Sequence, residues 1–189
     1  MDRLQTLLSG LDSTDYYKVF SHQMDYLLQQ NDFLEMVTNE LNKVVLENDA
    51  YKFYFITGLL FAGRDIDTGY GPLYLTMMDF VIDNYSKNND TGNERAIEYI
   101  LDLFWHRQEG LKNLDREGQL KLFRFLKITT GFKYEILEGS FDAAFFAVKK
   151  SMDLIKYQDG CGDSQLLKDM FFNHFDVWIR EEAATRITD

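Results

Sequence analysis

The sequence predicts an all-α protein, because amphipathic segments with helical spacing recur along the chain, turn-forming residues are scarce, and aromatic side chains are abundant. Of the 189 residues only one is Pro and 12 are Gly, too few for the many tight turns of a β-sandwich. Hydrophobic residues make up 46% of the chain and aromatic residues 15%, more than disordered chains carry. We therefore expect an irregular bundle of about seven to eight antiparallel helices, folded as a single helical domain over residues 1–189.

Helices are expected where apolar residues recur every three or four positions. Residues 51–62 are apolar on nearly every side, which predicts a central helix surrounded by neighbours. Pro72 suits the first turn of the next helix, where no amide hydrogen is required. Residues 132–139 mix aromatic and β-branched side chains and favour an extended connection. The expected helices cover residues 13–30, 32–47, 51–62, 72–85, 93–106, a segment around 120–126 that closes near 129–131, a helix capped by Ser140 or Asp142 and reaching 157, and 164–186.

A second architecture follows from the spacing of the helices. The first five expected helix starts are about 20 residues apart, so that two helices together span about 40 residues, the length of a HEAT-like unit. No residue pattern repeats between these pairs. A short HEAT-like α-solenoid is therefore the alternative to the irregular bundle.

Charge restricts the classes of partner. The chain has 31 acidic and 20 basic residues, a net charge of -11, which would repel phosphate backbones and anionic lipid. The first 70 residues hold 11 of the acids against 5 basic residues. We expect no direct nucleic-acid binding, no membrane anchor and a partner with a basic surface. The single Cys161 cannot form an internal disulfide, and the first residues lack the profile of a signal peptide, so that the sequence predicts a cytoplasmic protein.

One expected helix carries four residues whose side chains can bind metal ions, at a spacing of four positions: Glu94, Glu98, Asp102 and His106. Side chains four apart are neighbours on a helix, and such carboxylates can hold magnesium between paired helices. About 100° per residue, however, moves His106 to the far side of the apolar face that Glu94 borders. The spacing favours a solvated face, with a metal stripe of Glu94, Glu98 and Asp102 as the alternative.

Other catalytic patterns are weak. His174 lies between Phe171 and Trp178 at helical spacing, which favours a core histidine bonded to a backbone carbonyl over a catalytic base. Cys161 has Asp159 and Asp163 nearby, and two anions would raise the pKa of a thiol. The chain has no Gly-rich phosphate loop and no paired Cys-x-x-Cys. We therefore predict no catalytic residue, no cofactor and no enzymatic activity.

Two tyrosines are the best candidates for a recognition surface. Tyr26 falls opposite the apolar stripe of its helix, and Tyr70 follows a loop that contains Asp65 and Asp67. A tyrosine ring gives contact area with few rotors to order, while acids steer a basic partner. The sequence therefore predicts partner binding through Tyr26, Asp65, Asp67 and Tyr70.

The predicted function is a cytosolic protein-binding module that occludes a basic toxin or enzyme, as a bacterial immunity protein does. It rests on elimination and on charge, because a chain with a full core and no cofactor motif has its informative chemistry on the surface. One alternative is a helical-repeat scaffold or structural protein, for which a homo-oligomer is also compatible. The other is a metal-dependent all-α nucleotide hydrolase.

Overall fold

The computed structural model describes Leu4 and residues 25–65, 71–88, 94–133, 143–157 and 163–188. All regular secondary structure within these ranges is helical, which confirms the predicted all-α class. The chain has two compact units, unit 1 over residues 1–69 and unit 2 over residues 70–189, and each is described by itself. The single domain expected over residues 1–189 stays a prediction.

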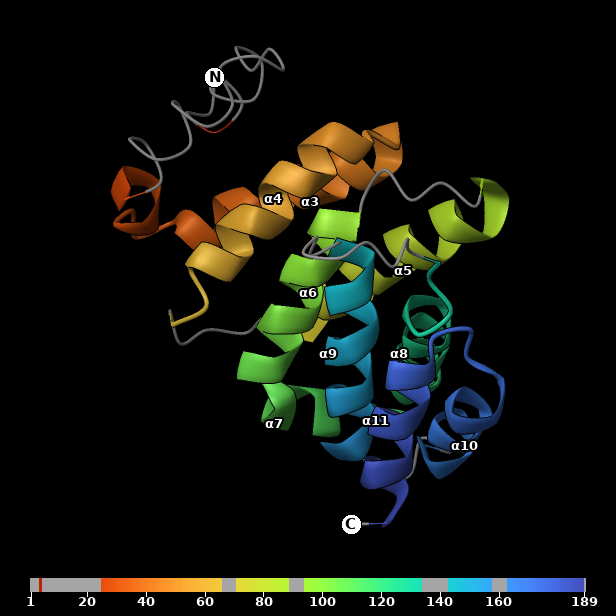
Figure 1. Cartoon of the computed structure of the whole chain (residues 1–189). Coiled ribbons are helices and arrows are strands. Elements are labelled where there is room, and N and C mark those ends of the chain that lie inside the picture. The colour runs from red at the N-terminus through yellow and green to blue at the C-terminus, as the bar shows by residue number, and fades with distance from the viewer. Residues whose placement is uncertain are drawn as a thin grey trace. The chain divides into compact units, whose positions relative to one another are not determined.

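The described helices agree with most of the expected bounds (Figure 1). Unit 1 has a short helical segment at residues 25–28, followed by α3 and α4. In unit 2 the five-residue helix α7 was not expected, because it is too short to show a periodic pattern. None of the described helices is long and apolar enough to cross a membrane. The bounds are α3 Phe33–Glu47, α4 Ala50–Ala62, α5 Gly71–Asn88, α6 Glu94–His106, α7 Gln108–Lys112, α8 Arg116–Thr129, α9 Ala143–Tyr157, α10 Asp163–Asn173 and α11 Val177–Thr188.

The turn between α3 and α4 is set by two adjacent polar residues. Asn48 ends α3 in the left-handed conformation, at φ 55°, and its backbone N–H bonds to the carbonyl of Val44. Asp49 then caps α4, because its Oδ1 accepts a hydrogen bond from the backbone N of Lys52 at 3.0 Å. Asn tolerates this backbone conformation, and Asp satisfies an amide at a helix start. The two helices can therefore reverse direction within two residues and pack on each other.

Helix α4 is the apolar segment that the sequence predicts to be buried. Its buried residues are Phe53, Phe55, Ile56, Thr57, Gly58, Leu59 and Leu60. Just beyond the helix, Gly63 approaches its neighbours closely: a Cβ there would lie 2.9 Å from the Phe33 ring and 3.1 Å from Leu28. Glycine suits this position, because a Cβ would force the Phe33 ring or the Leu28 side chain to shift.

The helices of unit 2 pack mainly in three pairs, α5 with α8, α6 with α9, and α10 with α11. Figure 1 shows α6 and α9 side by side. Helix α5 thus packs on α8 and α6 on α9, which resembles the stacking of helix pairs in a solenoid, although α5 and α6 make little contact with each other. Helices α10 and α11 pack chiefly on each other and then on α9, so that unit 2 combines stacked pairs with an irregular end.

Contacts between aromatic rings and between two buried hydroxyls join the helices of unit 2. The Phe104 ring of α6 lies 5.1 Å from the Tyr74 ring of α5 and 5.6 Å from the Phe125 ring of α8. The hydroxyls of Thr129 on α8 and Ser151 on α9 are 2.6 Å apart and fully buried. Burying a hydroxyl without a partner is costly, so this contact favours one register between α8 and α9.

The continuous helix expected over residues 164–186 is wrong, because α10 and α11 are separated at residues 174–176. Asp176 caps α11, since its Oδ1 accepts a hydrogen bond from the backbone N of Trp178 at 2.9 Å. The backbone N of Asp176 donates in turn to Nδ1 of His174 at 3.1 Å. His174 therefore bonds a backbone amide where a carbonyl partner was expected. Burial holds the pKa of His174 below its ordinary value, against the opposing effect of Asp176.

Candidate partner-binding surface

The structure places Tyr26 at the surface, 45% exposed, as its position opposite the apolar stripe predicts. Asp65, at the end of the described part of unit 1, is exposed as well. Asp67 and Tyr70, the other two residues of the predicted surface, lie outside the described residues.

Tyr26 and Asp65 lie at the same end of unit 1. Gly63 lies close to Leu28 and Phe33. Tyr26 is two residues before Leu28, and Asp65 is two residues after Gly63. Figure 1 shows the helical segment at residues 25–28 and the C-terminal end of α4 at this end of the unit. The fold therefore places two segments whose residues are 39 positions apart in the sequence at the same end of unit 1.

Two further exposed carboxylates occur beside these residues. Asp25 precedes Tyr26, and Asp32 precedes Phe33, whose ring meets Gly63. We call this surface the acidic end of unit 1, and its residues are Asp25, Tyr26, Asp32 and Asp65.

Arg64 is the basic residue nearest in sequence to Asp65, and its side chain contacts the C-terminal end of α4. Arg64 donates from Nη1 to the carbonyl of Phe61 at 3.1 Å, and its guanidinium lies 4.6 Å from the centre of the Phe61 ring. These contacts orient the guanidinium but leave its charge unchanged, and one positive charge only partly offsets the three carboxylates. The acidic end therefore keeps a negative potential.

The charge of the chain is concentrated in unit 1. Residues 1–69 contain 11 acidic and 5 basic residues, while the longer unit 2 contains the remaining 20 acidic and 15 basic residues. Two of the lysines of unit 1 already have acidic neighbours: Lys43 lies 2.8 Å from Glu40, and Lys52 lies 3.2 Å from both Glu47 and Asp49. The electrostatic potential around unit 1 is therefore negative overall, because its acidic residues outnumber its basic residues.

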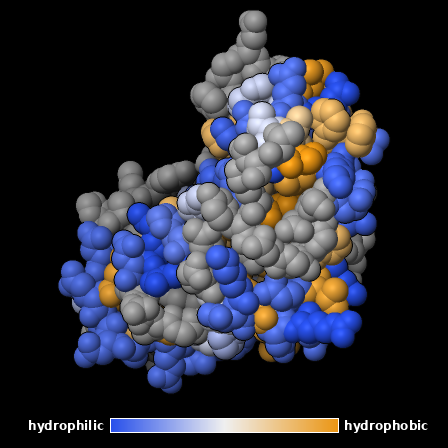
Figure 2. All heavy atoms as spheres, turned by 90° about the horizontal axis from the view of Figure 1, so that it is seen from below, coloured by the Kyte–Doolittle hydropathy of each residue, from blue (hydrophilic) through white to orange (hydrophobic). Residues whose placement is uncertain are grey.

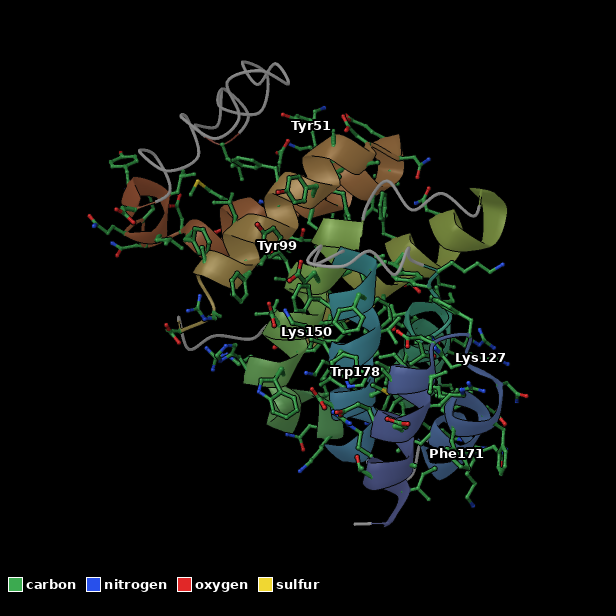
Figure 3. All side chains as sticks on the ribbon, in the orientation of Figure 1. Tyr51, Tyr99, Lys127, Lys150, Phe171 and Trp178 are labelled. Atoms are coloured by element: carbon green, nitrogen blue, oxygen red, sulfur yellow. The ribbon has the colours of Figure 1, made fainter. Side chains whose placement is uncertain are left out.

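A second exposed group on unit 1 was not predicted. Leu46, at the end of α3, is 87% exposed, and Tyr51, at the start of α4, is 38% exposed. Figure 3 labels Tyr51. Both lie beside the α3–α4 turn, where the first turn of α4 is open to solvent although the rest of that helix is buried. The sequence signal was present in part, since Leu46 falls outside the apolar stripe of its helix.

The stripe of Glu94, Glu98 and Asp102 differs from the expected solvated face. Lys150 reaches across from α9, and its Nζ lies 2.6 Å from Asp102 and 3.4 Å from Glu98 (Figure 3). The side chain of Glu98 is 13% exposed, that of Asp102 27% and that of Lys150 25%. The side chain of Glu94 lies outside the described part of the chain. Glu98 and Asp102 thus join α6 to α9 through a half-buried ion pair.

This ion pair bears directly on the metal alternative. A lysine ammonium supplies the positive charge that a divalent ion would bring to Glu98 and Asp102. Within the described ranges, no group of three or more His, Cys, Asp or Glu side chains is arranged to hold a metal ion. The geometry accounts for the two carboxylates as partners of Lys150.

We expect the double variant E98Q/D102N to lower the free energy of unfolding by about 1 to 2 kcal/mol, because Lys150 would keep its half-buried position without its anionic partners. Chemical denaturation measures this change. The control is D79N, whose carboxylate pairs with Lys121 at 2.7 Å but is 49% exposed; its loss should stay below about 0.5 kcal/mol.

Magnesium should raise the melting temperature of neither wild type nor E98Q/D102N. A metal site would instead stabilise wild type by about 2.7 kcal/mol at a hundredfold excess over the dissociation constant. A magnesium-dependent gain that disappears in the double variant would contradict the ion-pair interpretation and favour the hydrolase.

Comparison with known proteins gives no relative from which a site could be transferred: no family model, no curated protein and no solved structure matches this chain. The acidic end of unit 1 is therefore interpreted from its own residues, and its exposed carboxylates and tyrosine are suited to contact with a basic surface.

Proposed function

We propose that this chain is a protein-binding module whose acidic end occludes a basic surface of a partner protein. The observation that carries the proposal is that Asp25, Asp32 and Asp65 are exposed at the same end of unit 1 as the exposed Tyr26. Such a group combines long-range attraction with an aromatic anchor, which are the two properties that make a protein interface fast and specific.

The two parts of the surface have different roles in this proposal. The carboxylates raise the rate of encounter, because opposite charges attract over about a Debye length, roughly 8 Å at physiological salt. Tyr26 then contributes contact area and a hydroxyl that can donate or accept a hydrogen bond. An immunity-type inhibitor of a basic toxin or enzyme needs both, since it must capture its target quickly and then hold it.

The place of action that we propose is the cytoplasm. Its support is the lone Cys161, which fits a reducing compartment.

One observation favours a second candidate function, that of a helical-repeat scaffold. In unit 2 α5 packs on α8 and α6 packs on α9, and proteins built from stacked helices commonly present extended binding surfaces. In a scaffold of this kind the acidic end would be incidental to binding.

Capture of partners from a native lysate tests the proposal. Wild-type chain serves as bait at low and at high salt, beside the variant D25N/D32N/D65N. We expect a basic protein to be retained by wild type at low salt, released at high salt and not retained by the variant, because screening or removing the carboxylates abolishes the attraction.

A charge-matched control separates the acidic end from net charge. The variant D79N/D83N/E117Q removes three exposed or half-exposed carboxylates from unit 2 and should retain the partner as wild type does. If the two triple variants lose the partner equally, the acidic end is not the binding surface. If all three baits retain the same proteins at high salt, electrostatic capture is wrong.

A further inference from the structure

Unit 2 exposes a group of apolar side chains where α10 ends and α11 begins. Phe171 is 39% exposed, Phe172 70%, Phe175 49% and Val177 55%. We call these four residues the Phe corner. The sequence predicts Phe171 and Phe175 on the buried side of one long helix, but both are exposed: Phe171 near the end of α10 and Phe175 within the break at residues 174–176. Figure 3 shows Phe171 on the outer side of α10.

The Phe corner is held in place by defined contacts. The rings of Phe171 and Phe172 have their centres 4.8 Å apart, and the ring of Phe175 stacks on His174 at 4.6 Å. The cap that Asp176 provides to α11 fixes the chain directly after Phe175. Figure 2 shows apolar residues at the molecular surface among hydrophilic ones. Ordered rings lose little side-chain entropy when a partner covers them.

We propose that the Phe corner is the contact through which two copies of this chain form a weak, two-fold symmetric dimer. The inference goes beyond the proposed function, because it involves a different unit and a different partner. It rests on the exposed apolar area and on the local charge.

The exposed area matches what a small dimer interface needs. With roughly 200 Å² for an aromatic side chain, the three phenylalanines expose about 300 Å², to which Val177 adds. A standard interface buries about 800 Å² on each partner, of which about 57% is apolar, or roughly 450 Å². In a two-fold contact the same patch lies on both sides, so that the Phe corner supplies most of the apolar part and polar rim residues supply the rest.

Local charge favours a second copy over a basic partner at this surface. Lys168 and Asp169 precede the Phe corner, and Arg180 and Glu181 follow it, so that the charged side chains at its rim are balanced; Asp176, within the corner, is buried as the cap of α11. Two molecules of net charge -11 repel each other, and a locally neutral surface is where two copies can approach at the lowest electrostatic cost. In addition, the basic side chains of one copy can pair with the carboxylates of the other.

Sedimentation velocity of the full chain tests this inference, over a concentration range from about 5 to about 500 μM that covers weak association. We expect the average mass of wild type to rise from monomer towards dimer. The variant F172S should raise the dissociation constant at least about tenfold, because truncating an interface aromatic commonly weakens binding by that factor and a two-fold contact loses it on both sides. Phe172 is largely exposed, so that the variant should keep the wild-type melting temperature.

The control is L120S, which removes an apolar side chain that is 54% exposed on α8 and should leave association unchanged. Association should persist or strengthen at high salt, which screens the repulsion between copies, whereas capture of a basic partner should weaken there. A wild-type chain that stays monomeric throughout the range would overturn the inference, as would equal effects of F172S and L120S.

Discussion

Replacing Phe55 by Ala is expected to lower the free energy of unfolding by roughly 3 to 5 kcal/mol. Phe55 lies in the middle of α4 and is 1% exposed. Truncation removes the transfer free energy of the ring and leaves a cavity that a close-packed interior fills only in part. Chemical denaturation followed by circular dichroism measures the change.

The matched control on the same helix is Tyr51→Ala. Tyr51 is 38% exposed in the first turn of α4, and the loss there should be about 1 kcal/mol or less. A loss below about 1 kcal/mol for Phe55→Ala would place this face of α4 at the surface and contradict the fold described for unit 1.

The second large effect is expected in unit 2, where Phe104→Ala should also cost roughly 3 to 5 kcal/mol. Phe104 is fully buried, and its ring packs edge-on against Tyr74 and tilted against Phe125. Aromatic pairs of this geometry each add about 0.5 to 1.5 kcal/mol beyond the area they bury. The expected cost therefore lies towards the upper part of the range.

The adjacent residue provides the comparison for this measurement. Trp105 is 38% exposed, and Trp105→Ala should cost less than half as much although it removes the larger side chain. Equal losses for the two variants would mean that α6 does not turn its Phe104 face towards α5 and α8.

Helical periodicity was sufficient to predict most elements of the fold. The spacing of apolar residues predicted α3, α6 and α9 within a few residues of their observed ends, because one face of each helix is buried and the other is not. The same argument predicted that Tyr26 is exposed. The dipeptide Asn48-Asp49 marked the α3–α4 turn through its backbone preferences.

The break between α10 and α11 shows where periodicity is misleading. Phe171, Phe175 and Trp178 continue the apolar spacing of the preceding residues, and this continuity concealed the end of α10. The signal that was overlooked is Asp176, an N-cap residue type two positions before Trp178, whose amide it accepts. Local capping thus determined the structure where the apolar pattern indicated otherwise.

The partner of the acidic stripe could not be predicted from the sequence. Lys150 lies 52 positions after Glu98 and 48 after Asp102, and pattern analysis of one helix carries no information on which neighbour packs against it. The position of Asp65 beside the Tyr26 segment likewise depends on the packing of Gly63 against Leu28. Residue types on a surface are accessible from sequence, whereas their grouping requires the tertiary fold.

Affinity for the captured partner, measured by titration calorimetry at low and high salt, tests most directly the claim that the acidic end binds a basic protein. We predict that D25N/D32N/D65N raises the dissociation constant at least about tenfold at low salt, and that the difference from wild type narrows at high salt because the attraction is screened. Equal affinities for wild type and this variant at low salt would contradict the claim.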